Sequence, residues 1–237
     1  MCSSDLEFKN IVQLMEKHKT YYQAWTFPGG ISYKGRDDLR KVFPSFRYTQ
    51  TVKNNEKAAN LPTYFYAGKS FLDIAMGTGF FAIHAGLLGA TEVAGFDILD
   101  EPVEVANRIA KAYKLPCKVD FKVSEFWDYP FDRQYDVVYA NQCLDKFNCG
   151  HRSQCLGSED DMLNLVCGAS KRFLLAYMFF EESKPTPYDG GYYPSRDRLR
   201  HDLEKRGFDK IHIEKTVPPK THVTALKKYR NVIERDD

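Results

Sequence analysis

The stretch Phe71-Leu-Asp-Ile-Ala-Met-Gly-Thr-Gly-Phe-Phe81, followed by Val93-Ala-Gly-Phe-Asp-Ile98, decides the fold of this 237-residue chain. It predicts a buried strand, a glycine-rich turn, a helix and a second strand that ends in an acid. Gly77 and Gly79 have no Cβ, so the backbone can turn tightly and approach a ligand closely. Asp97 follows Gly79 by 18 residues, close to the spacing at which a carboxylate accepts hydrogen bonds from ribose hydroxyls. The pattern therefore predicts a nucleoside-binding site.

Two classes of cofactor fit this site. Gly77-x-Gly79-x-x-Ala82 also matches the dinucleotide fingerprint, so a nicotinamide or flavin cofactor is the alternative. Asp73, inside the first predicted strand, favours S-adenosylmethionine, because its carboxylate could reach the amino group of that cofactor and would repel a pyrophosphate. The long segment before the fingerprint, with no second catalytic domain after it, favours the same cofactor.

From about Gly68 to about Leu226 the chain resembles the class I S-adenosylmethionine-dependent methyltransferase family. Leu72-Asp-Ile-Ala-Met-Gly-Thr-Gly79 is similar to the first motif of that family, with Ala75 at the position where the first glycine is expected. Because alanine has the smallest side chain after glycine, we expect the cofactor loop to be retained, although displaced or weakened.

Three further segments carry the resemblance. Asp97 matches the ribose-binding acid, Phe121–Trp127 matches the third-strand segment, and Tyr135–Asn141 matches the fourth strand, whose end faces the methyl group. The resemblance implies a set of cofactor-binding residues: Asp73, Ala75, Gly77, Gly79, Asp97, Ile98, Glu125, Phe126 and Asn141.

A narrower similarity points to the branch that contains tRNA wobble-uridine methyltransferases. Gly79-Phe-Phe-Ala-Ile-His-Ala85 and Leu88–Asp97 carry it. The branch usually has a Leu-Tyr-His triplet after the fourth strand, where this chain has Leu144-Asp-Lys146. This departure concerns the substrate of the branch rather than the cofactor.

Strand and helix patterns alternate from Gly68 onward, which predicts a parallel sheet covered on both faces. Residues 210–216 and 221–227 look like two late strands with no helix between them, as in an antiparallel hairpin. The predicted fold is α/β: a Rossmann-like, doubly wound, mostly parallel seven-stranded sheet with an antiparallel C-terminal edge hairpin and a helical N-terminal cap. We predict two domains, a cap over residues 1–67 and an S-adenosylmethionine-binding methyltransferase domain over residues 68–237.

The composition is that of a soluble globular protein, with 43% hydrophobic and 28% charged residues. No apolar run reaches the roughly 18 residues that span a bilayer, so we expect no membrane association. The N-terminus lacks the basic and apolar regions of a signal peptide, and the six cysteines are therefore expected to be reduced thiols. These features predict a cytoplasmic protein; the oligomeric state is left open.

The net charge of +2 is unevenly distributed. Residues 1–67 and 192–237 are basic, whereas residues 68–191 carry eighteen acidic against twelve basic side chains. Basic flanks that converge over the pocket would attract an anionic substrate or a nucleic acid backbone. The alternative is that they are scattered, solvated surface residues.

The candidate catalytic residues follow the fourth predicted strand. Methyl transfer requires the nucleophile, methyl and sulfur to be collinear, and needs a base only when the nucleophile is protonated. Asn141 is the first candidate for a substrate-facing group, and Asp145 is a candidate base or hydrogen-bond acceptor. Metal binding is not expected, because the spacing within the nearby thiol and imidazole cluster does not match that of structural zinc sites. The cluster comprises Cys143, Cys149, His151 and Cys155.

Two aromatic-rich segments stand apart from these motifs and would either stack a planar substrate or pack the cap. They contain Trp25, Phe27, Tyr33, Tyr64, Phe65 and Tyr66, and Tyr188, Tyr192 and Tyr193. The predicted function is methyl transfer from S-adenosylmethionine to a small or medium-sized acceptor, with the cap and the loop 184–194 closing over it. A tRNA or other RNA nucleoside is the alternative acceptor. A non-catalytic cofactor-binding sensor or subunit is the second alternative.

Overall fold

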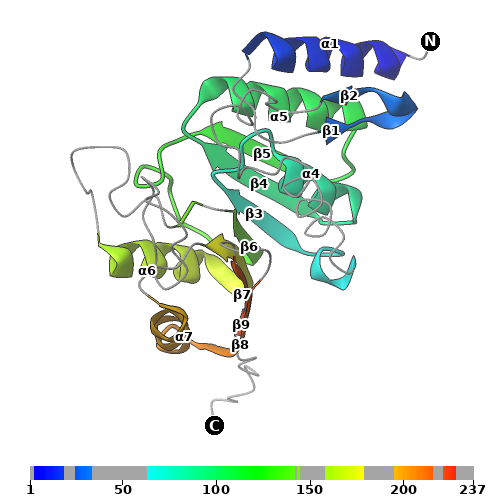
Figure 1. The fold of residues 1–237 in the computed structure, drawn as a ribbon. Helices are drawn as coiled ribbons and strands as arrows, with labels where there is room; N and C mark the ends of the chain where they lie inside the picture. The colour runs from blue at the N-terminus through cyan, green and yellow to red at the C-terminus, as the bar shows by residue number, and fades with distance from the viewer. Residues whose placement is uncertain are drawn as a thin grey trace. The chain divides into compact units, whose positions relative to one another are not determined.

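Seven strands form one sheet in the computed structural model of the chain (Figure 1). Its strand order is β5-β4-β3-β6-β7-β9-β8. The strands are β3 (Ser70–Ile74), β4 (Glu92–Asp97), β5 (Lys118–Val123), β6 (Tyr135–Asn141), β7 (Ser170–Met178), β8 (Phe208–Lys215) and β9 (Thr221–Lys227). The β3/β4, β4/β5 and β6/β7 pairs are parallel, whereas β9 pairs antiparallel with both β7 and β8. The predicted fold class, including its antiparallel hairpin, is confirmed.

The structure describes seven segments of the chain: residues 3–18, 25–33, 63–141, 143–144, 158–178, 195–215 and 221–227. The chain divides into two compact units, residues 1–129 and 130–237. The predicted domain boundary at residue 67 stays a prediction. In the described segments, no helix combines the length and the apolar character needed to cross a membrane.

The first unit is built on β3, β4 and β5. Apolar residues fill β3 and β4 because both strands are buried on both faces, as parallel strands are. Helices α4 (Phe80–Leu87) and α5 (Asp100–Tyr113) follow β3 and β4 and pack against this sheet. Helix α5 buries one face, which includes Val105, Ala106 and Ile109, and exposes its charged face.

The N-terminal part of the first unit contains helix α1 (Ser3–His18), which packs along α5 (Figure 1). Two-residue strands β1 (Trp25–Thr26) and β2 (Ser32–Tyr33) form an antiparallel ribbon beyond it. Phe8 of α1 stacks on Phe27 of the ribbon, with 4.9 Å between ring centroids. The helix confirms the helical character predicted for the cap, but the ribbon was not predicted, because two-residue strands show no alternation. Residues 34–62 lie outside the described segments.

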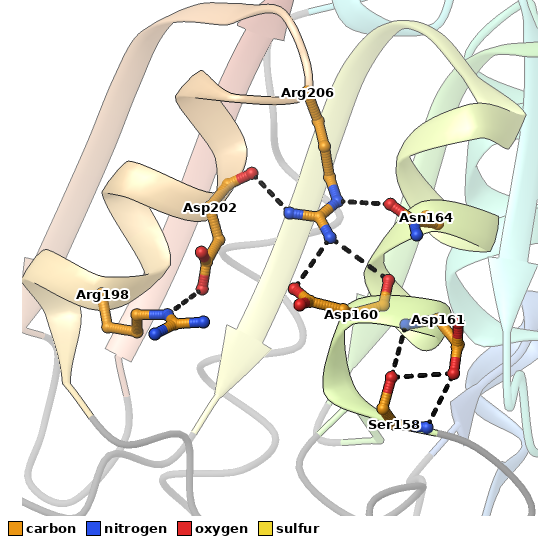
Figure 2. A network of polar contacts seen from close by, with 7 residues as sticks. All are labelled: Ser158, Asp160, Asp161, Asn164, Arg198, Asp202 and Arg206. Carbon is orange, nitrogen blue, oxygen red and sulfur yellow. Dashed lines mark hydrogen bonds and ion pairs between the residues drawn. The ribbon is translucent and has the colours of Figure 1, made fainter.

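The second unit combines β6, β7, β9 and β8 with helices α6 (Glu159–Ala169) and α7 (Arg196–Glu204). Ser158 begins α6 with a reciprocal capping box, in which its hydroxyl and backbone bond to Asp161. Arg206, after α7, donates to Asn164 Oδ1 and to Asp160, and so ties the two helices together (Figure 2). At the end of β9, the Lys227 ammonium donates to two carbonyl oxygens near the end of α6. Polar contacts thus join the helices of this unit to each other and to its sheet.

Candidate functional site

A tight loop, residues 75–79, connects β3 to α4 at the carboxyl end of the strand. Three of its residues have left-handed backbone, with φ of +53° at Ala75, +55° at Gly77 and +73° at Gly79. A Cβ at Gly79 would lie 3.0 Å from the Cβ of Ala106, so glycine is also required there for close helix packing. The loop is held to the sheet by the Met76 amide, which donates to the Phe96 carbonyl at 3.0 Å.

Ala75 is the residue that departs from the family pattern. It adopts the left-handed conformation that a glycine adopts without cost, and a non-glycine residue pays about 1 kcal/mol or more for it. The chain therefore keeps the backbone turn of the glycine motif despite the methyl group. The loop is strained at the position where the sequence predicted a displaced or weakened turn.

Asp97 ends β4 and binds the loop directly. Its Oδ2 accepts a hydrogen bond from the Gly77 amide at 2.9 Å, and its Oδ1 accepts one from the Leu99 amide at 3.2 Å. Burial raises the pKa of Asp97, and the bonds from the backbone amides oppose that shift. The predicted ribose-binding acid and the predicted glycine loop are thus in contact, which the sequence could suggest only through their spacing.

Asp73 lies deeper than the sequence suggested. Its side chain is 1% exposed, and its Oδ2 accepts a hydrogen bond at 3.3 Å from the Ala82 amide in the first turn of α4. Burial holds the pKa of Asp73 well above its usual range, and the negative charge of Asp97 raises it further. Among the described residues, no basic side chain forms an ion pair with either carboxylate. Two acidic side chains therefore lie close together at the ends of β3 and β4, and no basic side chain of the described residues neutralises either of them.

Exposed apolar side chains adjoin Asp97. Ile98 is 49% exposed and Leu99 is 47% exposed, directly after β4. Glu125, half-buried, begins the turn after β5, and the Ser124 amide donates to the Asp97 carbonyl at 2.9 Å. This contact brings the predicted third-strand acid to the same edge as the predicted ribose-binding acid.

Phe126 occupies a different environment from Ile98. Its ring is 4% exposed and lies 6.4 Å from the ring of Phe96, which stacks on Tyr129. The side chain therefore packs in the core beneath the edge, and a contact between its ring and an adenine stays a prediction.

The remaining predicted site residues belong to the second unit or lie outside the described segments. Asn141 is half-buried at the carboxyl end of β6, opposite Tyr177 in β7. Asp145 lies outside the described segments, as do Cys149, His151 and Cys155. Cys143 is buried, and no group of three metal-ligating side chains occurs within the described part of the chain.

The N-terminal aromatic segment supplies a contact that the sequence did not predict. Trp25 in the ribbon donates its indole N–H to the Thr78 hydroxyl of the glycine loop at 2.8 Å. Trp25 and most of its aromatic neighbours in sequence are buried, as in packing of the cap, whereas Tyr64 is 62% exposed. Tyr188, Tyr192 and Tyr193 lie outside the described segments. Nothing in the local sequence pairs Trp25 with Thr78, because 53 residues separate them.

Residues 71–164 match a protein-family model described as a methyltransferase domain. The ribosomal protein L11 methyltransferase of Dictyoglomus turgidum is 33% identical over 81 residues, which are 34% of this chain and 26% of that protein. The matched part is thus about a quarter of the length of that relative.

Two solved structures show the same fold. The N-terminal domain of EvdMO1 with S-adenosylhomocysteine bound has a TM-score of 0.66 at 13% identity, over 94% of this chain and 97% of that one. The magnesium protoporphyrin IX methyltransferase ChlM of Synechocystis PCC 6803, with S-adenosylmethionine bound, has a TM-score of 0.54 at 16% identity over the same shares. At these identities, the likeness establishes the fold.

Proposed function

We propose that this chain, whose residues 71–164 match a methyltransferase domain, is a class I S-adenosylmethionine-dependent methyltransferase that transfers a methyl group to a small or medium-sized acceptor. The observation that carries the proposal is the Asp97 carboxylate at the end of β4, bound to the amide of Gly77 and followed by exposed Ile98. This arrangement places a carboxylate, a glycine backbone without side chains and an exposed apolar surface next to one another in the first unit.

The residues at this edge fit S-adenosylmethionine. A carboxylate has about four acceptor positions, so Asp97 retains capacity for a ribose hydroxyl beyond its backbone bonds. Ile98 and Leu99 offer apolar surface that an adenine ring would cover. The loop between Ala75 and Gly79 would let the methionine part approach the backbone closely.

The electrostatics of this edge favour a cationic ligand over a pyrophosphate. The negative charge of Asp97 already raises the pKa of Asp73, so additional phosphate charge would be repelled. A sulfonium and an ammonium group would instead be attracted to the same two carboxylates. This supports S-adenosylmethionine against the dinucleotide alternative.

The chain's own part in the reaction is to bind, orient and exclude water. When bound, the cofactor would supply a methyl group whose carbon the acceptor attacks in line with the sulfur, as the carbon–sulfur bond breaks and the sulfur leaves as a neutral thioether. Asp97 and the loop would fix the nucleoside end, so that the methyl group has one position relative to the acceptor. We assign Asn141 to the acceptor side as a hydrogen-bonding group, and Asp145 as a base for an acceptor that must lose a proton.

A small acceptor is proposed because the similar structures include an enzyme described as a magnesium protoporphyrin IX methyltransferase. RNA remains the alternative acceptor, supported by the basic flanks of the sequence. A cytoplasmic location stays a prediction from the sequence.

Two experiments test the proposal. Calorimetric titration with S-adenosylmethionine, S-adenosylhomocysteine and NAD⁺ is expected to show binding of the first two only; binding of NAD⁺ alone would overturn the cofactor assignment. Incubation with the methyl-labelled cofactor is expected to label a small-molecule extract and not total tRNA. Label in tRNA would support the RNA alternative, and binding without label in either pool would support a non-catalytic protein.

A further inference from the structure

The contact between Trp25 and Thr78 joins two segments that the sequence treats as separate. The indole N–H of Trp25 lies 2.8 Å from the Thr78 hydroxyl oxygen, and both side chains are buried, at 2% and 1% exposure. Thr78 stands between Gly77 and Gly79, the two glycines of the loop. A group from the N-terminal ribbon therefore reaches into the centre of the proposed cofactor loop.

Aromatic packing fixes the direction of the Trp25 indole. Its ring stacks on Phe27 at 5.5 Å with 4° between the planes, and it meets the edge of Phe80 at 5.0 Å. Phe27 in turn stacks on Phe8 of α1, and the ribbon pairs Trp25 with Tyr33. The ring is thus held by aromatic residues of the N-terminal part and by Phe80 of α4, and these contacts, rather than the hydrogen bond to Thr78, set the position of its N–H.

Hydrogen bonds attach the loop to its surroundings on two sides. The Gly77 amide is bound to Asp97, the Met76 amide is bound to Phe96, and the Thr78 hydroxyl is bound to Trp25. The first two are contacts to β4, and the third is the contact to the ribbon. Because Thr78 lies between two residues with left-handed backbone, its orientation bears on where both neighbouring peptide groups point.

We infer that Trp25 is a positioning residue for the cofactor loop, acting through the Thr78 hydroxyl, and that the N-terminal ribbon is thereby a working part of the cofactor site. The inference rests on the proposed function, since it assumes that the loop binds S-adenosylmethionine. The ribbon holds the loop in its binding conformation. By linkage, the bound cofactor stabilises the contact between ribbon and loop by the same free energy.

Variants that remove one hydrogen-bonding group at a time test this inference. Trp25→Phe keeps an aromatic ring without the N–H, and Thr78→Val keeps the shape of the side chain without the hydroxyl. Each is expected to weaken S-adenosylhomocysteine binding about fivefold in calorimetric titration, the effect of losing one hydrogen bond. The double variant is expected to bind no more weakly than either single variant, because both remove the same contact.

Two further variants separate positioning from general packing. Ile11→Val trims a buried side chain of α1 but leaves Trp25, its ring partners and Thr78 unaltered, so it is expected to lower the melting temperature without changing the affinity. Thr78→Ser retains the hydroxyl and is expected to restore binding. The inference is overturned if Thr78→Val binds like the unmodified protein, if the single effects add in the double variant, or if Ile11→Val weakens binding equally. Failure of the unmodified protein to bind would instead refute the proposed function.

Discussion

The polar groups at the carboxyl ends of β3 and β4, in the first unit, differ from those between α6 and α7, in the second unit, in how they are paired. In the second unit, Arg206 is matched by the Asp160 carboxylate, by Asn164 and by the Asp202 carbonyl (Figure 2). Every acid drawn there has a donor, and the bonds from Ser158 lower the pKa of Asp161. This network stabilises the packing of the two helices.

At the carboxyl ends of β3 and β4, by contrast, several features lower the stability of the folded state. Asp73 and Asp97 are buried or half-buried with raised pKa values, and Ala75 is strained. Large apolar side chains are exposed beside them. Backbone strain and acids with perturbed pKa values are concentrated at functional sites, so the contrast supports our proposal that the carboxyl ends of β3 and β4 form the functional site.

The largest expected effect concerns Gly79. Gly79→Ala adds left-handed strain and a contact of 3.0 Å with Ala106, and we expect it to lower the free energy of unfolding by about 3 kcal/mol. Gly30→Ala is the matched control, because its φ is +74° but a Cβ there would meet nothing within 4 Å. Urea denaturation should show a loss of about 1 kcal/mol for the control. Equal losses would mean that close packing at Gly79 contributes nothing.

Removal of Arg206 tests the structural side of the comparison. Arg206→Met deletes the bonds to Asn164, Asp160 and the Asp202 carbonyl, and is expected to cost about 2 kcal/mol of unfolding free energy. Arg200→Met, which removes one exposed bond to the Ile211 carbonyl, should cost well under half as much. Cofactor affinity should stay unchanged in both variants. A weakened affinity in Arg206→Met would place the network in the working part of the protein.

Asp97→Ala should show the reverse division between affinity and stability. It is expected to weaken cofactor binding by at least about 1.5 kcal/mol, because charge-assisted bonds to the ribose and to the Gly77 amide are lost. Asp100→Ala provides a control, since Asp100 is exposed and lies three residues further along the chain. Calorimetric titration should find its affinity normal. Unchanged binding in Asp97→Ala would remove β4 from the cofactor site.

The pH dependence of unfolding gives a smaller effect, which is read from how the free energy of unfolding changes with pH. Burial raises the pKa of Asp73 above its unfolded value, so the folded state binds more protons above pH 3.8. Ionisation of Asp73 therefore lowers stability as the pH rises from 3.8 through the folded pKa. Asp73→Asn should gain stability relative to the unmodified protein over this rise, measured by urea denaturation between pH 4 and pH 8. A constant difference between the two proteins would contradict the assignment.

The smallest effect should come from Ala75. Ala75→Gly relieves the left-handed strain and is expected to raise the unfolding free energy by about 0.5 kcal/mol, after the greater chain entropy of glycine is included. Lys114→Gly is the matched variant outside the site, because Lys114 has a φ of +50° at the end of α5. The melting temperature should rise for both variants. A gain confined to Lys114→Gly would show that the loop has adapted to its methyl group.

The sequence predicted local features better than distant contacts. The strand, turn and helix around Gly77 and Gly79 were legible because apolar runs and glycines act within a few residues. The parallel sheet followed from the alternation of strands and helices. The depth of Asp73 was not legible, since burial depends on what the rest of the unit places around a strand. The hydrogen bond between Trp25 and Thr78 could not be predicted from the sequence either, because it forms only when the cap is folded against the loop.

The position of β9 has a consequence for how the second unit is assembled during synthesis. Residues 221–227 leave the ribosome after β8, yet they pair with both β7 and β8. Until they emerge, neither of those strands has its partner on that side, and nascent chains interrupted before Thr221 would present open strand borders to chaperones and to other chains. Pairing among β3, β4 and β5 needs no such wait, because these three strands are translated in succession.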